Sequence, residues 1–198
     1  WEPGSKLQRW SQIRQGWPNQ PLRLYGAGAD SGTFDYFTEA IVGKAKAIRT
    51  DYQPTEDDNV TIKGVAGDTY AMGFLGYAYY EENKDKVKAV AIDHGKGCVL
   101  PSRETVLDGT YQPLSRPLFI YVNVKSLDRP EVQAFVDFYL SPAARRAIRS
   151  TGYVELPSEA YRIGQELVKR RKAGTFFMEL PAGTPLSKFI QELDKELR

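Results

Sequence analysis

The chain has 198 residues, 41% hydrophobic and 26% charged, a composition typical of a folded globular protein and unlike that of a disordered one. Its 27 Lys and Arg residues nearly balance its 25 Asp and Glu residues, so net charge gives no reason to expect a nucleic acid or an anionic membrane as partner, and any anion recognition must be local. One cysteine excludes an internal disulfide, and one cysteine with one histidine excludes a Cys/His zinc site. No run approaches the ~18 apolar residues of a membrane-spanning helix.

The first third of the chain predicts a strand–loop–helix unit. Residues 5–17 are expected to form a turn and a short helix, which Pro18 ends before a strand over 21–25. A small-residue loop follows, and then a helix over 34–48 with Phe34, Phe37 and Ile41 on its buried side.

The middle of the chain predicts an acidic loop over 51–59, a helix capped near Thr55 and Asp58, and a short helix over 68–72. The aromatic, glycine-rich residues 73–80 indicate a buried strand, and residues 88–92 a further strand. His94 is expected in a solvated loop and Cys98 as a small buried side chain.

The last part begins with a connector over 108–117. Residues 118–122, Leu-Phe-Ile-Tyr-Val, predict a buried strand. Four helices are expected after it, over 130–140, 142–151, 157–172 and 184–197, with Phe135 and Val136 of the first facing inward. Strands alternate with helices, which indicates an α/β architecture.

The most informative segment is residues 30–37, Asp-Ser-Gly-Thr-Phe-Asp-Tyr-Phe. Two hydroxyls and several backbone N–H groups stand where a helix begins, which is an arrangement that holds small anions without a metal. The alternative is that Asp30, Ser31 and Thr33 only cap the helix, since these residue types are ordinary helix caps.

A hydrolase with Ser31 as nucleophile is a weaker alternative. It needs a base, and the only histidine is His94, which has no supporting motif around it. The Gly-x-Ser-x-Gly pattern of many serine hydrolases is absent. The sequence therefore predicts no catalytic residues, no metal site and no cofactor.

Several blocks in order resemble periplasmic phosphate-binding proteins, the substrate-binding subunits of the phosphate ABC transporter. They are residues 24–39, 49–52, 56–59, 73–80, 101–106 and 111–118. The resemblance runs over essentially the whole chain and corresponds to the C-terminal two-thirds of such proteins.

The resemblance implies an α/β fold of the type II periplasmic-binding-protein class, a lobe with a mixed sheet and flanking helices, plus the C-terminal part of its partner lobe. Residues 1–107 would form the second ligand-binding lobe, and residues 108–198 the hinge return and the end of the first lobe. Roughly a hundred N-terminal residues of such a fold would be missing. Exposed apolar surface on residues 118–198 is expected to need that segment, a second copy of the chain or repacking.

The resemblance also implies inorganic phosphate as ligand, with Ser31, Gly32 and Thr33 as its main contacts and Asp30 beside them. Many relatives carry an arginine four residues before the serine, where this chain has Ala27. Arg49 is the expected substitute, and the alternative is an ion pair of Arg49 with Asp51, Glu56 or Asp57.

Selectivity for phosphate over sulfate needs an acceptor for the phosphate proton, and the possible acceptors are Asp30, Asp35 and Glu56. The expected location is periplasmic or extracytoplasmic, with the membrane permease of the importer as partner and no nucleic acid. The other expectation is a truncated lobe that binds no ligand and serves as an interaction or scaffold module.

Overall fold

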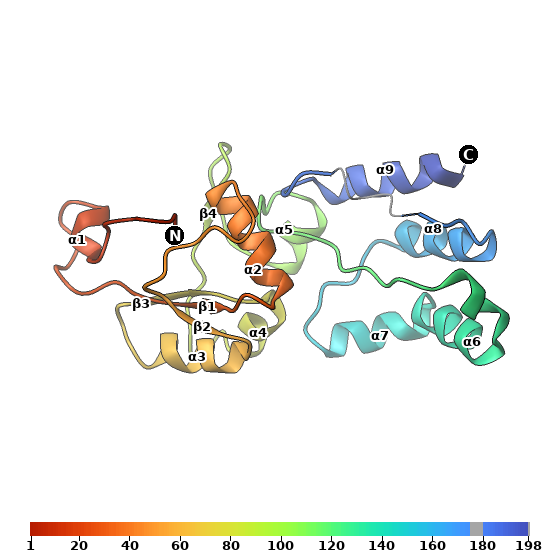
Figure 1. Ribbon diagram of the computed structural model, residues 1–198, viewed down its shortest axis with the longest axis horizontal. Coiled ribbons are helices and arrows are strands. Elements are labelled where there is room, and N and C mark those ends of the chain that lie inside the picture. The colour runs from red at the N-terminus through yellow and green to blue at the C-terminus, as the bar shows by residue number, and fades with distance from the viewer. Residues whose placement is uncertain (175–179, 198) are drawn as a thin grey trace. The chain divides into compact units, whose positions relative to one another are not determined.

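The computed structural model describes residues 1–174 and 180–197 (Figure 1). The chain forms two compact units, Trp1–Val90 and Ala91–Arg198. The lobes expected from the sequence, 1–107 and 108–198, concern a complete two-lobed fold and stay a prediction. No helix of the described ranges is long and apolar enough to cross a membrane.

The first unit is built on a parallel sheet in the order β2-β1-β3, with β1 at Arg23–Ala27, β2 at Gln53–Thr55 and β3 at Ala71–Phe74. In its register Tyr25 pairs with Gln53 and with Gly73. Helices α2 (Gly32–Phe37) and α3 (Asp58–Ala66) lie on opposite sides of the sheet, α4 (Tyr77–Glu82) follows β3, and α1 (Trp10–Ile13) lies beyond the strands (Figure 1).

The core of the first unit is aromatic. Phe37 of α2 stacks on Phe74 of β3 with ring centroids 3.9 Å apart, and Trp1 meets both rings edge-on. The Phe74 ring takes the space above Gly26, where a Cβ atom would come within 2.2 Å of Phe74 Cε1. Glycine at residue 26 is therefore what lets the ring pack on the central strand.

Several sequence predictions for this unit were wrong in detail. The helix expected over 34–48 ends at Gly43, as α2 continues only into a π-helical turn, η1 (Thr38–Val42), and Ile41 is exposed. Residues 73–80 are the end of β3 and then α4, and the short helix expected over 68–72 is a turn leading into β3. The short helix expected within residues 5–17 is present as Trp10–Ile13.

The second unit starts with an antiparallel hairpin, β4 (Ile92–Asp93) and β5 (Cys98–Val99), and a short helix α5 (Arg103–Leu107). A 3-10 turn, η2 (Val124–Asp128), precedes four helices: α6 (Pro130–Tyr139), α7 (Pro142–Ser150), α8 (Ser158–Lys169) and α9 (Leu186–Leu197). These four agree with the predicted helices. For α6 and α7 the sequence signal is a proline in the first turn. Cys98 is exposed, which corrects the expectation of a buried side chain, since it lies in a two-residue strand at a hairpin turn.

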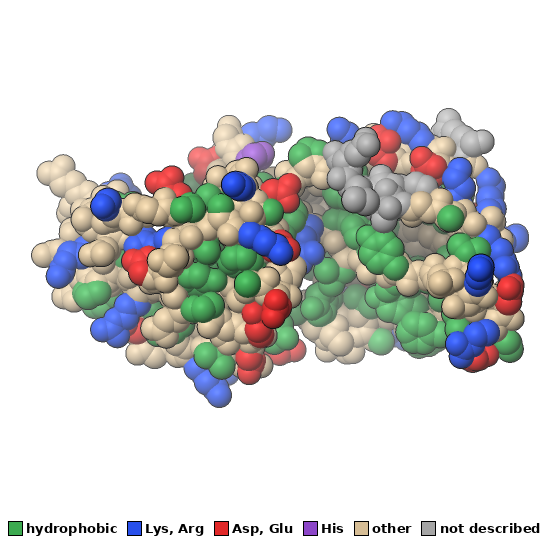
Figure 2. Space-filling view, viewed as in Figure 1, with side chains coloured by type: hydrophobic (Ala, Val, Ile, Leu, Met, Phe, Trp, Pro, Cys, Tyr) green, Lys and Arg blue, Asp and Glu red, His purple; other side chains and the backbone are tan. Residues whose placement is uncertain are grey.

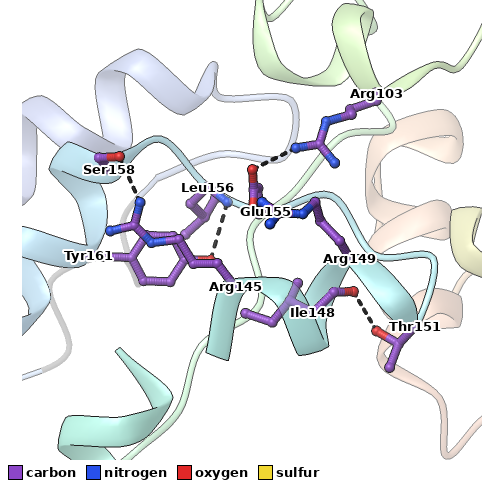
Figure 3. A network of polar contacts seen from close by, with 9 residues as sticks. All are labelled: Arg103, Arg145, Ile148, Arg149, Thr151, Glu155, Leu156, Ser158 and Tyr161. Atoms are coloured by element: carbon purple, nitrogen blue, oxygen red, sulfur yellow. Dashed lines mark hydrogen bonds and ion pairs between the residues drawn. The ribbon is translucent and has the colours of Figure 1, made fainter. Parts of the chain in front are cut away.

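An ionic network joins α5 to α7 in the second unit (Figure 3). Glu155, only 18% exposed, accepts from Arg103 at 2.7 Å and also pairs with Arg149. Beside it, the guanidinium of Arg145 stands 4.5 Å from the ring centroid of Tyr161 and donates to Ser158 Oγ at 2.7 Å. One carboxylate thereby fixes two arginines from separate helices.

The buried strand expected over 118–122 is absent from the structure, where residues 115–123 lie in no helix or strand. Tyr121 is 78% exposed, and Leu118, Phe119 and Ile120 are also exposed. Phe135 of α6 is exposed too, contrary to prediction, while Val136 is buried as expected. Figure 2 shows hydrophobic side chains gathered on this unit.

The segment 120–123 and α6 border an open groove of about 480 Å³ that is lined mainly by apolar side chains. An extended apolar segment forms a strand only when a neighbouring strand takes its backbone hydrogen bonds. The described residues place no strand beside 118–122, so this apolar sequence stays exposed.

Candidate functional site

Three helices begin at one edge of the parallel sheet. Chain leaving β1, β2 and β3 at their carboxyl ends enters α2, α3 and α4 after four, two and two residues. The carboxyl edge of a parallel sheet is where ligands bind in open α/β folds. The sheet topology therefore places the Ser31 loop at the position where such a fold binds ligands.

Ser31 is the N-cap of α2. It has extended backbone angles, and its hydroxyl accepts a hydrogen bond from Thr33 N–H at 3.1 Å. The capping function considered from the sequence is thus confirmed. Because Thr33 N–H is already engaged, an anion at this helix start would take its hydrogen bonds from Gly32 N–H and from the hydroxyls of Ser31 and Thr33.

Glu56 connects the loop after β2 with the loop after β1. Its Oε1 accepts from Asp30 N–H at 3.4 Å, and the buried Gly28 leaves room for that oxygen. Gly28 N–H donates to Thr55 O at 3.0 Å, and Ser31 N–H donates to Gly28 O at 3.1 Å. These bonds hold residues 28–31 against the end of β2 and so orient the start of α2.

Asp58 carries a perturbed carboxyl group at the same edge. Burial raises the pKa of Asp58, a hydrogen bond from the Gly76 N–H lowers it, and the nearby Asp57 raises it, with an upward net effect. Gly76 is the N-cap of α4, so Asp58 joins the starts of α3 and α4. From the sequence, Thr55 and Asp58 were expected only at the cap of this helix; its N-cap is Asp57, and Asp58 lies in the first turn. Its link to Gly76 depends on the parallel strand order, for which no local motif exists.

Asp35 occupies the first turn of α2, four residues after Ser31. Its Oδ1 is buried and has no hydrogen-bond partner within residues 1–174 and 180–197. Side chains four apart on a helix share a face and point towards its N-terminus. Asp35 therefore lies in the first turn of α2, within one helical turn of the Ser31 cap.

Arg49 lies in a different environment from the one expected of a phosphate ligand. Its guanidinium is 4% exposed and forms a bidentate ion pair with Asp51, Nε to Oδ1 at 2.5 Å and Nη2 to Oδ2 at 2.7 Å. The Arg49 N–H donates to Trp1 O at 3.0 Å. The structure thus contains the Asp51 ion pair that the sequence allowed as an alternative, and it shows no hydrogen bond from Arg49 to Ser31, Gly32 or Thr33, all of them described.

Of the five predicted ligand residues, the structure brings Asp30, Ser31, Gly32 and Thr33 together at one helix start and sets Arg49 in its own ion pair. Glu56 and Asp35, weighed from the sequence as proton acceptors, adjoin that helix start. His94 lies in the exposed β4–β5 turn of the second unit, as expected of a solvated loop residue.

Comparison with known proteins defines the class. Residues 5–143 match the PBP superfamily domain, so the chain belongs to that superfamily. This confirms the α/β fold class and the resemblance derived from the sequence blocks.

Within that superfamily, the chain is similar to the following individual proteins. The chain is 50% identical to the protein SphX of Synechocystis sp. over 95% of its own length and 58% of the relative, and 35% identical to the phosphate-binding protein PstS of Staphylococcus haemolyticus over 79% and 49%. The crystal structure of a possible phosphate binding protein from Planctomyces limnophilus matches at a TM-score of 0.72 and 43% identity, covering 87% of this chain and 62% of that one. The chain thus spans about half to three fifths of the length of these relatives.

Proposed function

We propose that the chain binds inorganic phosphate as the extracytoplasmic solute-binding component of a phosphate ABC importer, with Ser31, Gly32 and Thr33 as the contacts that this chain supplies. The observation that carries the proposal is the capped start of α2 at the carboxyl edge of the parallel sheet. Similarity to PstS of Staphylococcus haemolyticus supports phosphate as the ligand.

Neutral donors are sufficient for such a site. The partial positive charge of a helix start favours an anion, and each hydrogen bond to a charged group contributes roughly 1.5–3 kcal/mol net. Gly32, without a side chain, lets the anion approach the backbone closely. In this proposal Arg49 acts at a distance, by holding the loop after η1 through its ion pair with Asp51.

Asp35 is the proposed acceptor for the phosphate proton. Its buried, unpartnered Oδ1 would be satisfied by a protonated phosphate oxygen and would repel fully ionised sulfate. Asp30 and Glu56 are more exposed, and Glu56 Oε1 already accepts a hydrogen bond from the backbone N–H of Asp30, which makes Glu56 better suited to shaping the loop.

The proposed partners are the membrane permease of the importer and the N-terminal segment of the complete fold. The exposed apolar residues 118–121 support the need for a covering segment or a second copy of the chain. A lobe that serves only as a scaffold is the other candidate function, favoured by the cap that Ser31 provides without any ligand. The relatives are binding proteins, so a hydrolase has no support from them.

The deciding experiment is isothermal titration calorimetry of this chain with phosphate and with sulfate, using the wild type, Ser31→Ala and Ser141→Ala. Ser141 caps α7 in the second unit as Ser31 caps α2, so its variant loses a helix cap away from the proposed site. We expect phosphate binding that Ser31→Ala weakens at least tenfold and Ser141→Ala leaves unchanged.

The absence of phosphate heat in the wild type would instead favour the scaffold function. Asp35→Asn separates the acceptor from the other contacts. We expect this variant to lose its preference for phosphate over sulfate. The neutral amide accepts the phosphate proton less strongly than a carboxylate does, and it does not repel sulfate as a carboxylate does.

A further inference from the structure

The near-neutral charge of the whole chain conceals one strongly unbalanced stretch. From Pro3 to Ala29 there is no acidic residue, although the chain as a whole has 25. Four cations lie in that stretch: Lys6, Arg9, Arg14 and Arg23. Arg23 pairs with Asp68 and Arg9 donates to Asn19 O. Lys6 and Arg14 have no ion-pair partner in the described ranges of the chain.

This stretch is an ordered arm and not a loose tail. We call residues 6–21 the basic arm. Leu22 N–H donates to Gln8 O at 2.8 Å and Trp10 N–H donates to Gln20 O at 3.1 Å, so the arm folds back on itself. Trp10 Nε1 anchors it to the first unit by donating to Tyr70 O at 2.9 Å.

The basic arm exposes apolar side chains beside its cations. Leu7, Ile13 and Trp17 are 40%, 44% and 39% exposed. The Arg14 guanidinium lies 5.9 Å from the Trp17 ring centroid, and Trp10 and Trp17 pair at 5.6 Å. One short arm therefore carries an exposed tryptophan in contact with an arginine, two exposed aliphatic side chains and two cations without an ion-pair partner in the described ranges.

The basic arm lies at the edge of the sheet away from the proposed phosphate site. It joins the sheet where β1 begins, and its anchor Tyr70 directly precedes β3. Ser31 follows the opposite, carboxyl ends of these strands. The arm therefore contributes nothing to the Ser31 site and is free to contact something else.

We infer that the basic arm binds an anionic lipid surface. Lys and Arg are attracted to anionic headgroups, and tryptophan with aliphatic side chains inserts at the boundary between headgroups and acyl chains. An acidic protein surface would pair with Lys6 and Arg14. It would not account for the exposed apolar side chains of the arm. The combination of the two kinds of side chain therefore favours lipid.

The test is co-sedimentation of the chain with vesicles of phosphatidylcholine containing 30% phosphatidylglycerol, and with vesicles of phosphatidylcholine alone, at low and high salt. Lys6→Glu/Arg14→Glu reverses the arm charges. Its matched control, Lys44→Glu/Lys63→Glu, reverses two exposed cations of the same unit and has the same net charge. Ile13→Ser/Trp17→Ser removes apolar contacts and keeps the cations.

We expect binding to anionic vesicles that falls at least fivefold at high salt and with the arm charge variant, falls severalfold with the apolar variant, and persists in the control. All the altered side chains are exposed, and circular dichroism checks that each variant is folded. Absence of binding to anionic vesicles, or equal loss in the control, would overturn the inference. Capture of an acidic protein without any vesicle binding would overturn it as well.

Discussion

Glu56 and Gly28 are in direct contact across the ends of β1 and β2: a Cβ atom at residue 28 would lie 2.0 Å from Glu56 Oε1. The same oxygen accepts from Asp30 N–H. The loops after β1 and β2 therefore pack against each other because Gly28, which has no side chain, leaves room for the Glu56 carboxylate.

Gly28→Ala tests this contact. The added methyl displaces the flexible end of Glu56, so we expect a stability loss below about 1 kcal/mol together with severalfold weaker phosphate binding, because the loop that presents Ser31 loses its support. Calorimetry measures the affinity. Adding Glu56→Ala to Gly28→Ala should weaken binding little further, because the support from Glu56 is already lost, and losses that simply add in the double variant would contradict the explanation.

Gly26→Ala concerns the core below that loop. Its Cβ atom would meet the Phe74 ring at 2.2 Å, and that ring is stacked on Phe37 and cannot move freely. We expect a loss of about 1–3 kcal/mol in the free energy of unfolding, measured with urea. Gly164→Ala in α8 is the control, since its Cβ atom would make only ordinary contacts at 3.6 Å and it should be neutral or stabilising.

The Arg49–Asp51 ion pair predicts a pH dependence of stability. The hydrogen bond from Arg49 holds the pKa of Asp51 below its usual value, despite an opposing effect of burial. A carboxyl group with a lowered pKa in the folded state stabilises the protein above its ordinary pKa of about 4, and this contribution is lost as pH falls through the folded-state pKa.

Unfolding curves between pH 7 and pH 3 measure this effect. Asp51→Asn should be less stable than wild type at pH 7, and the difference should shrink towards pH 3. A difference that stays constant across this range would contradict the role of the ion pair.

Glu155 is expected to be the most important single carboxylate of the second unit. Glu155→Gln leaves Arg103 and Arg149 with a neutral partner and should cost about 1–3 kcal/mol of that unit's stability. Glu131→Gln breaks the exposed pair with Arg129 and should cost less than about 0.5 kcal/mol. Equal effects in urea unfolding would show that the network adds nothing beyond an exposed pair.

The exposed segment 118–121 predicts self-association of the chain at high concentration. Tyr121→Ser replaces the most exposed of its aromatic rings with a small polar side chain. We expect size-exclusion chromatography with light scattering to show a concentration-dependent mass for wild type and a smaller rise for the variant. A strictly monomeric wild type over the same concentrations would contradict the prediction.

The sequence was most informative where local signals decide the structure. The helices expected over 130–140 and 142–151 correspond to α6 and α7, because proline marks their first turn. The cap at Ser31 was predicted because a serine precedes glycine and threonine there. The family resemblance rested on several ordered blocks, and the match over residues 5–143 confirmed it.

Most errors of the sequence predictions concern contacts between residues that are far apart in the sequence. Residues 118–122 have the composition of a buried strand, but strand formation needs a neighbour that the described chain does not place beside them. The Asp58–Gly76 and Glu56–Asp30 contacts join the ends of strands whose order in the sheet no local pattern reveals. Whether Arg49 pairs with Asp51 or reaches further also depends on how its loop folds, which its neighbours in sequence do not specify.

The two ends of the parallel sheet differ in sign. Carboxylates of Asp30, Glu56 and Asp58 border its carboxyl end, and the cations of the acid-free stretch lie where the chain enters β1. An anionic surface attracts the cations near the entry to β1 and repels the carboxylates at the opposite end of the strands. Such a surface is met by the cationic end first, which leaves the start of α2 facing the open solution from which a small anion must arrive.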